Sequence, residues 1–268
     1  MDSSAPIGIF DSGIGGMTVA RAIKDILPDE QIIYFGDTAH LPYGDKSAAT
    51  IQAYSIKITD VLLSRGCKVI LIACNSASSA AFELVKEYAG SKAKVFNVVD
   101  PMIDYVREQY SDARIGLIGT KQTVSSGVYI DKIAATDKGL KLNSLETPLL
   151  VHMIEEGFIH NQISKEIIGQ YLENDTLTNI SALILACTHY PLIKRDIDEF
   201  YKDEIEVIDS SVIVARSLKA YLEYNNLINK TKPCEDEFLV SDYTESFEKT
   251  TKLFFGKLVR LEKYTLWE

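Results

Sequence analysis

The stretch VILIACNSAS, residues 69–78, decides the fold of this chain. Its first residues are aliphatic and largely β-branched, which is typical of a buried strand, and Cys74 stands where that strand ends. Small polar residues follow, and the pattern over 76–90 predicts a helix directly after the cysteine. A short apolar strand that leads at once into a helix is the repeating unit of a parallel α/β sheet.

A second stretch, ALILACTHYP at 182–191, has the same arrangement around Cys187. The chain has only four cysteines, so two in matching contexts indicate an internal repeat. The segment IGIFDSGIGG at 7–16 also resembles IGLIGTKQTV at 115–124. The first pair of motifs is separated by 113 residues and the second by 108, so the two halves of the chain are nearly in step.

Apolar strands alternate with helical patterns along most of the chain, which predicts parallel sheets covered on both faces. We expect an α/β fold of two pseudo-symmetric lobes, each a mainly parallel sheet flanked by helices, with the active site in the cleft between them. The first lobe, on the Cys74 side, is expected to comprise residues 1–96 plus 208–268. The second, on the Cys187 side, is expected to comprise residues 97–207. Ligands of such sheets bind at the carboxyl ends of the strands, where both cysteines lie.

Composition limits the partners of the protein. The chain has 268 residues and a net charge of −10, which argues against nucleic acid as a partner, since phosphate binding needs clustered Lys and Arg. No apolar run approaches the roughly 20 residues of a membrane helix, so no membrane partner is expected. The start, MDSSAPIGIF, lacks the basic and apolar regions of a signal peptide. We therefore expect a cytoplasmic protein whose thiols are kept reduced.

A cysteine between a strand and a helix lies at the helix N-terminus, where the helix dipole favours the thiolate. We therefore expect both thiols to have a pKa below the usual value of about 8.5. The residues after each cysteine are small hydrogen-bonding ones that, with helix N–H groups, can hold a carboxylate without lysine or arginine. These residues are Asn75, Ser76, Thr188 and His189. The pattern predicts a small anionic substrate.

Two thiols on opposite faces of one carbon indicate a specific reaction. One thiolate removes a proton, and the other thiol returns a proton to the opposite face, which inverts the carbon. General acid–base catalysis of this kind typically supplies about 10²–10⁴-fold, so stabilisation of the carbanion must contribute as well. Asp11, at the end of the first strand, can serve Cys74, and His189, two residues past Cys187, can serve that cysteine.

Four segments together resemble one family: FDSGIGG (10–16), GDTAHLPYG (36–44), ACNSAS (73–78) and ACTHYPL (186–192). They are similar to the glutamate racemases of the aspartate/glutamate racemase superfamily, in the order and at the spacing of that family. The resemblance covers most of the chain. It implies a cofactor-independent interconversion of L- and D-glutamate by two thiols, which supplies D-glutamate for peptidoglycan synthesis. It also allows a homodimer, although no interface can be read from the sequence.

The resemblance assigns roles to individual residues. Cys74 and Cys187 are the two catalytic acid/bases, the first acting on the D-enantiomer and the second on the L-enantiomer. Asp11 assists the first and His189 the second, and no metal is implied. The substrate-contacting positions carried over by motif are Asp11, Ser12, Tyr43, Gly44, Asn75, Ser76, Thr188 and His189.

Two positions depart from the family pattern. Ser76 stands where the family usually has threonine, a change that keeps the hydroxyl. The segment TPLLVHMIE at 147–155 corresponds to a family block in which His152 replaces a proline, and Glu155 falls on the glutamate of that block.

Four other functions are compatible with paired cysteines. The first is racemisation of aspartate or another small acid, although the sequence blocks favour glutamate. The second is a redox switch in which Cys74 and Cys187 form a disulfide. The third is a zinc site with His189, although the closely spaced ligand pairs typical of zinc are lacking. The fourth is a two-lobed binding protein without catalysis.

Overall fold

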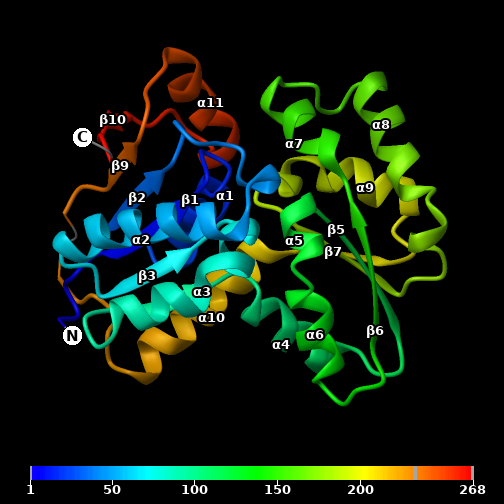
Figure 1. Ribbon diagram of the computed structural model, residues 1–268, viewed down its shortest axis with the longest axis horizontal. Helices are drawn as coiled ribbons and strands as arrows, with labels where there is room; N and C mark the ends of the chain where they lie inside the picture. The colour runs from blue at the N-terminus through cyan, green and yellow to red at the C-terminus, as the bar shows by residue number, and fades with distance from the viewer. Residues whose placement is uncertain (1, 232–233, 267–268) are drawn as a thin grey trace.

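The computed structural model of the protein describes residues 2–231 and 234–266. Two lobes lie side by side, each built on its own parallel sheet, and the chain passes from the first to the second and returns (Figure 1). None of the helices in the described part of the chain is long and apolar enough to span a bilayer.

The first lobe contains a six-stranded sheet in the order β10-β9-β2-β1-β3-β4. Its strands are β1 (Ile7–Asp11), β2 (Ile32–Gly36), β3 (Val69–Ile72), β4 (Lys94–Asn97), β9 (Glu237–Val240) and β10 (Glu262–Lys263). Its helices are α1 (Met17–Ile26), α2 (Ala48–Ser64), α3 (Asn75–Ala89), α10 (Ser210–Tyr224) and α11 (Glu245–Phe255), with a 3-10 turn η1 (Tyr43–Asp45). The C-terminal segment thus extends the first sheet, because β9 pairs with β2.

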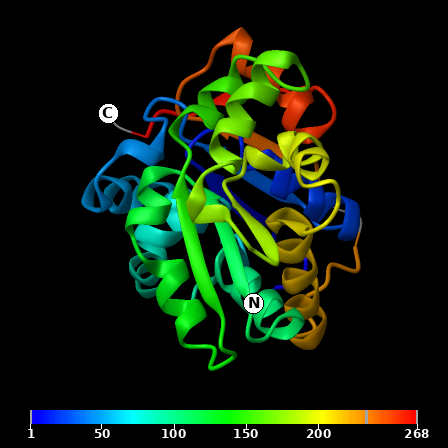
Figure 2. The ribbon, with the colours of Figure 1, turned by 90° about the vertical axis from the view of Figure 1, so that its right-hand side faces the viewer.

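The second lobe contains a four-stranded sheet in the order β6-β5-β7-β8 (Figure 2). Its strands are β5 (Arg114–Gly119), β6 (Lys141–Glu146), β7 (Ala182–Ala186) and β8 (Glu206–Asp209). Its helices are α4 (Asp100–Gln109), α5 (Lys121–Ser125), α6 (Val128–Ala134), α7 (Pro148–Glu155), α8 (Gln162–Leu172) and α9 (Lys194–Tyr201), with 3-10 turns η2 (Asp175–Leu177) and η3 (Tyr190–Ile193).

The two sheets share a local strand order, which accounts for the repeat in the sequence. β1 lies between β2 and β3, and β5 lies between β6 and β7, all parallel. In each sheet the chain leaves the central strand to one side and then to the other, which opens a crevice at the carboxyl ends of β1 and β3 and of β5 and β7. The cysteines follow β3 and β7, so each lies at such a crevice.

Three apolar clusters cover the faces of the two sheets. Alternation along β1 sends Ile7 and Ile9 into a cluster with α1 and α10, while Phe10 joins a second cluster with α2 and α3. The first cluster continues into the second lobe, where it includes Leu183. The third cluster lies between the second sheet and helices α4 and α6. The lobes therefore share one continuous apolar core rather than meeting only at polar surfaces.

The predicted α/β class and two-lobed arrangement are confirmed. The expected lobe boundary between residues 207 and 208 falls inside β8, a strand of the second sheet. The sequence patterns missed β6, an edge strand whose residues are mostly half-exposed and polar, so it lacks the apolar run of the central strands.

A buried ion pair lies at the amino ends of the strands of the first sheet. The Lys68 ammonium, fully buried, lies 2.6 Å from Glu30 Oε2 and donates to the carbonyl oxygens of Ser3 and Leu227. The Asn229 N–H donates to the other oxygen of Glu30. This network ties the segment after α10 to strands β2 and β3.

We expect Lys68→Ala to lower the free energy of unfolding by about 3–5 kcal/mol, because it leaves the Glu30 carboxylate buried without its cation. Urea denaturation of the variant and the wild type measures the difference. Lys86→Ala serves as the control, since its ion pair with Glu83 is exposed and contributes little. Equal stabilities of the two variants would contradict the prediction.

Candidate active site

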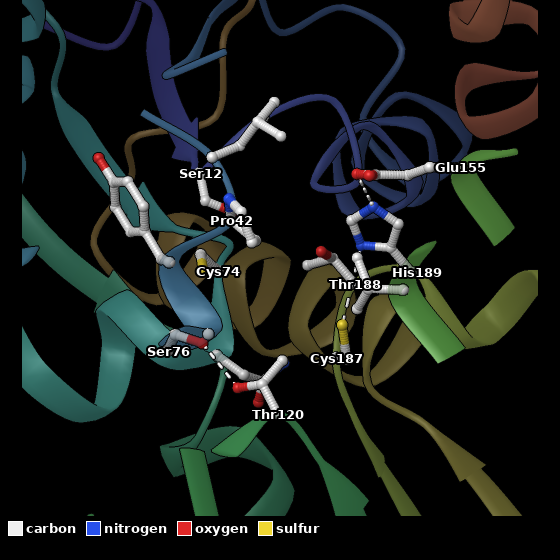
Figure 3. Close-up of a pocket in the computed structure, with 15 residues that line it drawn as sticks. Ser12, Pro42, Cys74, Ser76, Thr120, Glu155, Cys187, Thr188 and His189 are labelled. Carbon is white, nitrogen blue, oxygen red and sulfur yellow. Dashed lines mark hydrogen bonds and ion pairs between the residues drawn. The ribbon is translucent and has the colours of Figure 1, made fainter. Parts of the chain in front are cut away.

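A small pocket lies between the lobes at the carboxyl ends of the strands. Figure 3 shows Cys74 and Cys187 on opposite sides of this pocket, with Ser12, Pro42 and Ser76 around the first and His189 beside the second. Its free volume is about 30 Å³, room for about two water molecules, whereas pockets that hold small ligands usually measure about 300–1,000 Å³. The pocket in this arrangement of the lobes is therefore much smaller than those that usually hold small ligands.

Cys74 is the residue immediately before α3, with an extended backbone (φ −71°, ψ 125°) that aims it at the pocket edge. The expectation of a low pKa is wrong here. Burial raises the pKa of the Cys74 thiol to about 12, and the nearby Asp11 carboxylate adds to the rise. Hydrogen bonds from the Ala77 N–H and the Ser12 hydroxyl lower it, but by less. Cys74 is therefore a protonated thiol in this state.

Asp11 ends β1 directly behind the pocket and is fully buried. Its carboxylate accepts a hydrogen bond from the Gly13 N–H at 3.0 Å and one from the Thr188 hydroxyl, across the cleft, at 3.4 Å. Burial raises the pKa of Asp11, while the charge of His189 opposes the rise. A carboxylate with a raised pKa next to Cys74 is suited to exchange a proton with that thiol.

Cys187 follows β7. The helix that was expected to begin directly after this cysteine is absent from this described part of the chain. Cys187, Thr188 and His189 lead into the 3-10 turn η3 instead, so the support for this thiol comes from a side chain. His189 Nδ1 lies 3.7 Å from Cys187 Sγ, and His189 Nε2 lies 2.9 Å from Glu155 Oε1 (Figure 3). The three groups form a chain of thiol, imidazole and carboxylate.

The hydrogen-bonded row of Cys187, His189 and Glu155 keeps His189 positively charged. Burial alone lowers the pKa of His189, but its hydrogen bonds to Cys187 and Glu155 outweigh that effect and raise the pKa to about 10. An imidazolium beside Cys187 stabilises the thiolate. The two sides of the pocket therefore differ: Cys74 is a neutral thiol, whereas Cys187 lies beside a positively charged imidazolium.

The glycines of FDSGIGG allow the first lobe to approach both supporting groups. A Cβ on Gly15 would lie 2.4 Å from His189 Cε1 and 2.5 Å from its Nδ1. A Cβ on Gly16 would lie 2.6 Å from Asp11 Cβ. Any side chain at these positions would collide with Asp11 or His189, which explains the glycines without invoking a phosphate-binding loop.

The loop that carries Tyr43 and Gly44 is held from behind by a buried carboxylate. The Tyr43 hydroxyl donates its proton to Asp37 Oδ2 at 2.5 Å. Asp37 Oδ1 accepts from Ser241 Oγ at 2.7 Å and lies 2.8 Å from His40 Nδ1. Tyr43 and Gly44 both line the pocket, and the backbone of this loop forms part of its wall.

The first turn of α3 meets hydroxyl groups of the second lobe. Ser76 Oγ lies 2.9 Å from Thr120 Oγ1 (Figure 3), and the Asn75 carboxamide oxygen accepts from the Tyr129 hydroxyl at 2.8 Å. The Asn75 carboxamide nitrogen is buried without a partner among the described residues. This turn thus offers a free donor beside its backbone N–H groups.

The structure brings the predicted site residues together. The residues that line the pocket include Ser12, Tyr43, Gly44, Cys74, Asn75, Ser76, Cys187, Thr188 and His189. Asp11 lies one layer behind and contacts Thr188. In the described part of the chain, no group of three or more His, Cys, Asp or Glu side chains is arranged to hold a metal ion.

Several residues in or behind the pocket were not among the predicted site residues. Thr120 occupies the position in the second half of the repeat that Ser12 occupies in the first, so the repeat itself could have identified it. Val151 and Glu155 come from α7, and only the family block pointed to Glu155. Asp37 directly follows a buried strand, and this strand-end position is the signal that could have identified it.

Comparison with known proteins agrees with this geometry. The family model described as Asp/Glu/Hydantoin racemase matches residues 17–218. The protein named glutamate racemase from Chlorobium phaeobacteroides is 40% identical over 93% of this chain and 92% of its own length.

Two solved structures are similar over nearly the whole chain. The glutamate racemase from Francisella tularensis in complex with D-glutamate has a TM-score of 0.91 at 37% identity, covering 98% of each chain. The one from Thermus thermophilus in complex with beta-chloro-D-alanine has a TM-score of 0.88 at 35% identity, covering 99% of each chain. A two-lobed α/β racemase is thus the class that the fold defines. The chain belongs to the Asp/Glu/Hydantoin racemase family, in the branch of the glutamate racemases.

Proposed function

We propose that the protein interconverts L- and D-glutamate without a cofactor by moving the α-proton between Cys74 and Cys187. The observation that carries the proposal is the position of these two thiols, which follow equivalent strands of the two lobes and line one closed pocket from opposite sides. Each thiol has its own ionisable neighbour, Asp11 for the first and His189 for the second.

In the direction from L- to D-glutamate, the Cys187 thiolate takes the α-proton. The Cα–H bond breaks, an S–H bond forms at Cys187, and the electron pair remains on the substrate. The Cys74 thiol then gives its proton to the opposite face of Cα, which leaves Cys74 as the thiolate. The raised pKa of Cys74 and the imidazolium beside Cys187 support this starting state. Starting from D-glutamate, the same steps run in reverse.

The carbanion needs stabilisation, because the α-proton of an amino acid is only weakly acidic. Its charge spreads into the α-carboxylate, so donors to that group bind the transition state more strongly than the substrate. The backbone N–H groups of the first turn of α3 and the Ser76 hydroxyl, in the pocket wall, are such donors. Exclusion of bulk water strengthens these hydrogen bonds.

The closed volume and the shared polar contacts support binding by lobe movement. Thr18 Oγ1 donates to the Thr188 carbonyl oxygen at 3.0 Å, and Ser76 meets Thr120, so both lobes contribute to the same walls. We infer that the two lobes, divided close to the expected boundaries but after Asn97, the last residue of β4, and after Asp209, the last residue of β8, separate to admit glutamate and close around it.

Two further expectations complete the proposal. The reaction needs reduced thiols, so we place it in the cytoplasm, where it supplies D-glutamate for peptidoglycan synthesis. A homodimer remains a prediction, which sedimentation of the purified protein tests.

The test of the function is incubation of the metal-free protein with L-glutamate in deuterated water. We expect loss of optical rotation together with incorporation of deuterium at Cα, followed by NMR. Activity with aspartate but not with glutamate would assign aspartate as the substrate instead. Inactivity with all small acidic amino acids would refute the proposal, and reversible linkage of Cys74 to Cys187 by oxidant would then favour a redox switch.

The pH dependence tests the chain from Cys187 to Glu155. We expect kcat/KM for L-glutamate to fall as the pH rises through about 10, because His189 then loses the proton that stabilises the thiolate. Glu155→Gln removes a negative partner of His189, lowers its pKa, and shifts this fall to lower pH. Glu156→Gln, at the exposed neighbouring position, is expected to keep the wild-type profile. Identical profiles for both variants would exclude a role for Glu155.

A further inference from the structure

The two polar atoms of the Asn75 side chain, in the pocket wall, differ in their hydrogen bonding. Asn75 is 2% exposed, and its Oδ1 accepts a hydrogen bond from the Tyr129 hydroxyl at 2.8 Å. Its Nδ2 is buried and has no hydrogen-bond partner within the described residues. Buried N–H groups are nearly always satisfied, so a donor without a partner in the wall of a pocket is suited to a ligand.

Tyr129 is placed to keep the carboxamide in this orientation. It lies on α6 of the second lobe, is 3% exposed, and packs in the apolar cluster that covers the second sheet. Burial raises the pKa of Tyr129 well above its usual value, so the hydroxyl keeps its proton at any working pH. The hydroxyl donates to the carboxamide oxygen, which leaves the carboxamide nitrogen on the side away from Tyr129.

We propose that Tyr129 is a positioning residue that fixes the Asn75 carboxamide with Nδ2 as a donor to a carboxylate of the substrate. This inference rests on the proposed function. If the carboxamide were free to turn over, its oxygen would face the carboxylate for part of the time and repel it. The ligand group is a carboxylate, because an ammonium group has no lone pair to accept this hydrogen bond.

The contact also depends on the arrangement of the lobes. Asn75 belongs to α3 of the first lobe, while Tyr129 comes from the second. The neighbouring residue Ser76 meets Thr120 of the second lobe in the same way. The Asn75 carboxamide is therefore oriented by Tyr129 when the lobes are closed. Its hydrogen bond to the substrate carboxylate then forms together with lobe closure.

Steady-state kinetics of Tyr129→Phe tests the inference. We expect KM for both enantiomers of glutamate to rise about tenfold while kcat stays within about threefold, because a contact made equally in the substrate and transition state affects KM alone. Tyr201→Phe is the control, since it removes another buried phenol hydroxyl, on α9, that has no hydrogen-bond partner in the described part of the chain. We expect this control to match the wild type.

A double-mutant cycle separates positioning from general weakening. If Tyr129 acts through Asn75, Tyr129→Phe adds no further rise in KM to that of Asn75→Ala. As a second variant, Asn75→Asp keeps an acceptor for Tyr129 but replaces the free donor by a carboxylate oxygen. We expect it to have a higher KM than Asn75→Ala. This comparison does not depend on the folding of the Tyr129 variant.

Each outcome has a distinct meaning. Additive effects in the cycle, an unchanged KM in Tyr129→Phe, or an Asn75→Asp variant that binds as well as the wild type would overturn the inference while leaving the racemase intact. A wild-type protein that does not act on glutamate would instead refute the proposed function. The two failures are therefore distinguishable in one set of assays.

Discussion

Replacing either Cys74 or Cys187 by alanine is expected to lower racemisation of glutamate by at least about 10³-fold, because each turnover needs one thiol on each face of Cα. Loss of one thiol leaves the carbanion without a proton donor on the far side. Polarimetry with each enantiomer, at equal protein concentrations, measures the effect. Full racemisation by either variant would contradict the two-thiol mechanism.

The two variants should differ in the exchange that remains. Cys74→Ala keeps the Cys187–His189 pair and is expected to exchange the α-proton of L-glutamate for deuterium slowly, with retention. Cys187→Ala should do so only with D-glutamate. Cys67→Ala is the matched control, because this thiol is buried in the core beside Gly8 and not among the pocket-lining residues. If both active-site variants exchanged the α-proton of the same enantiomer, the assignment of one cysteine to each enantiomer would be wrong.

Gly15→Ala is expected to lower kcat/KM by about 10²-fold, although the alanine touches no substrate. Its methyl group would lie 2.4 Å from the His189 ring, which is held on its other sides by Glu155 and by the ring of Phe254 at 5.1 Å. The imidazole must move, and displacement of a catalytic group by about 1 Å can cost this much. Initial rates with both enantiomers provide the measurement.

Gly169→Ala provides the control for this substitution. Gly169 lies inside α8, and an added Cβ would meet nothing within 4 Å, so helix propensity alone predicts a small gain in stability and unchanged kinetics. Thermal unfolding of both variants separates loss of folding from loss of geometry. A folded Gly15→Ala protein with wild-type rates would show that the position of His189 tolerates movement.

The regular part of the fold could be predicted because local pattern and tertiary role coincide there. β1, β3, β5 and β7 are short apolar runs, buried on both faces, and the helices that follow cover them. The edge strand β6 could not be predicted, because its pairing with β5 rather than its own composition makes it a strand. Edge strands need no continuous apolar run, so their pattern is weak.

The sequence predicted which side chains lie together at the site, but not the ionisation state of Cys74. The strand-end positions of Cys74 and Cys187 pointed to a pair of thiols, and the repeat pointed to their opposition. The pKa of Cys74 was predicted in the wrong direction, because helix N-terminal donors were the only local effect visible. Burial and Asp11, which is far away in sequence, dominate in the folded protein.

The sequence by itself determined the α/β class, the internal repeat, and the two cysteines with their polar neighbours that meet at the pocket, since periodicity and strand-end position are local properties. The tertiary structure alone decided which side chain supports which. His189 lies 34 positions from Glu155, and Asn75 lies 54 from Tyr129, yet each pair is within hydrogen-bonding distance. Hydrogen bonds and desolvation act through space over a few ångströms, so neither the charge of His189 nor the free donor of Asn75 can be read along the chain.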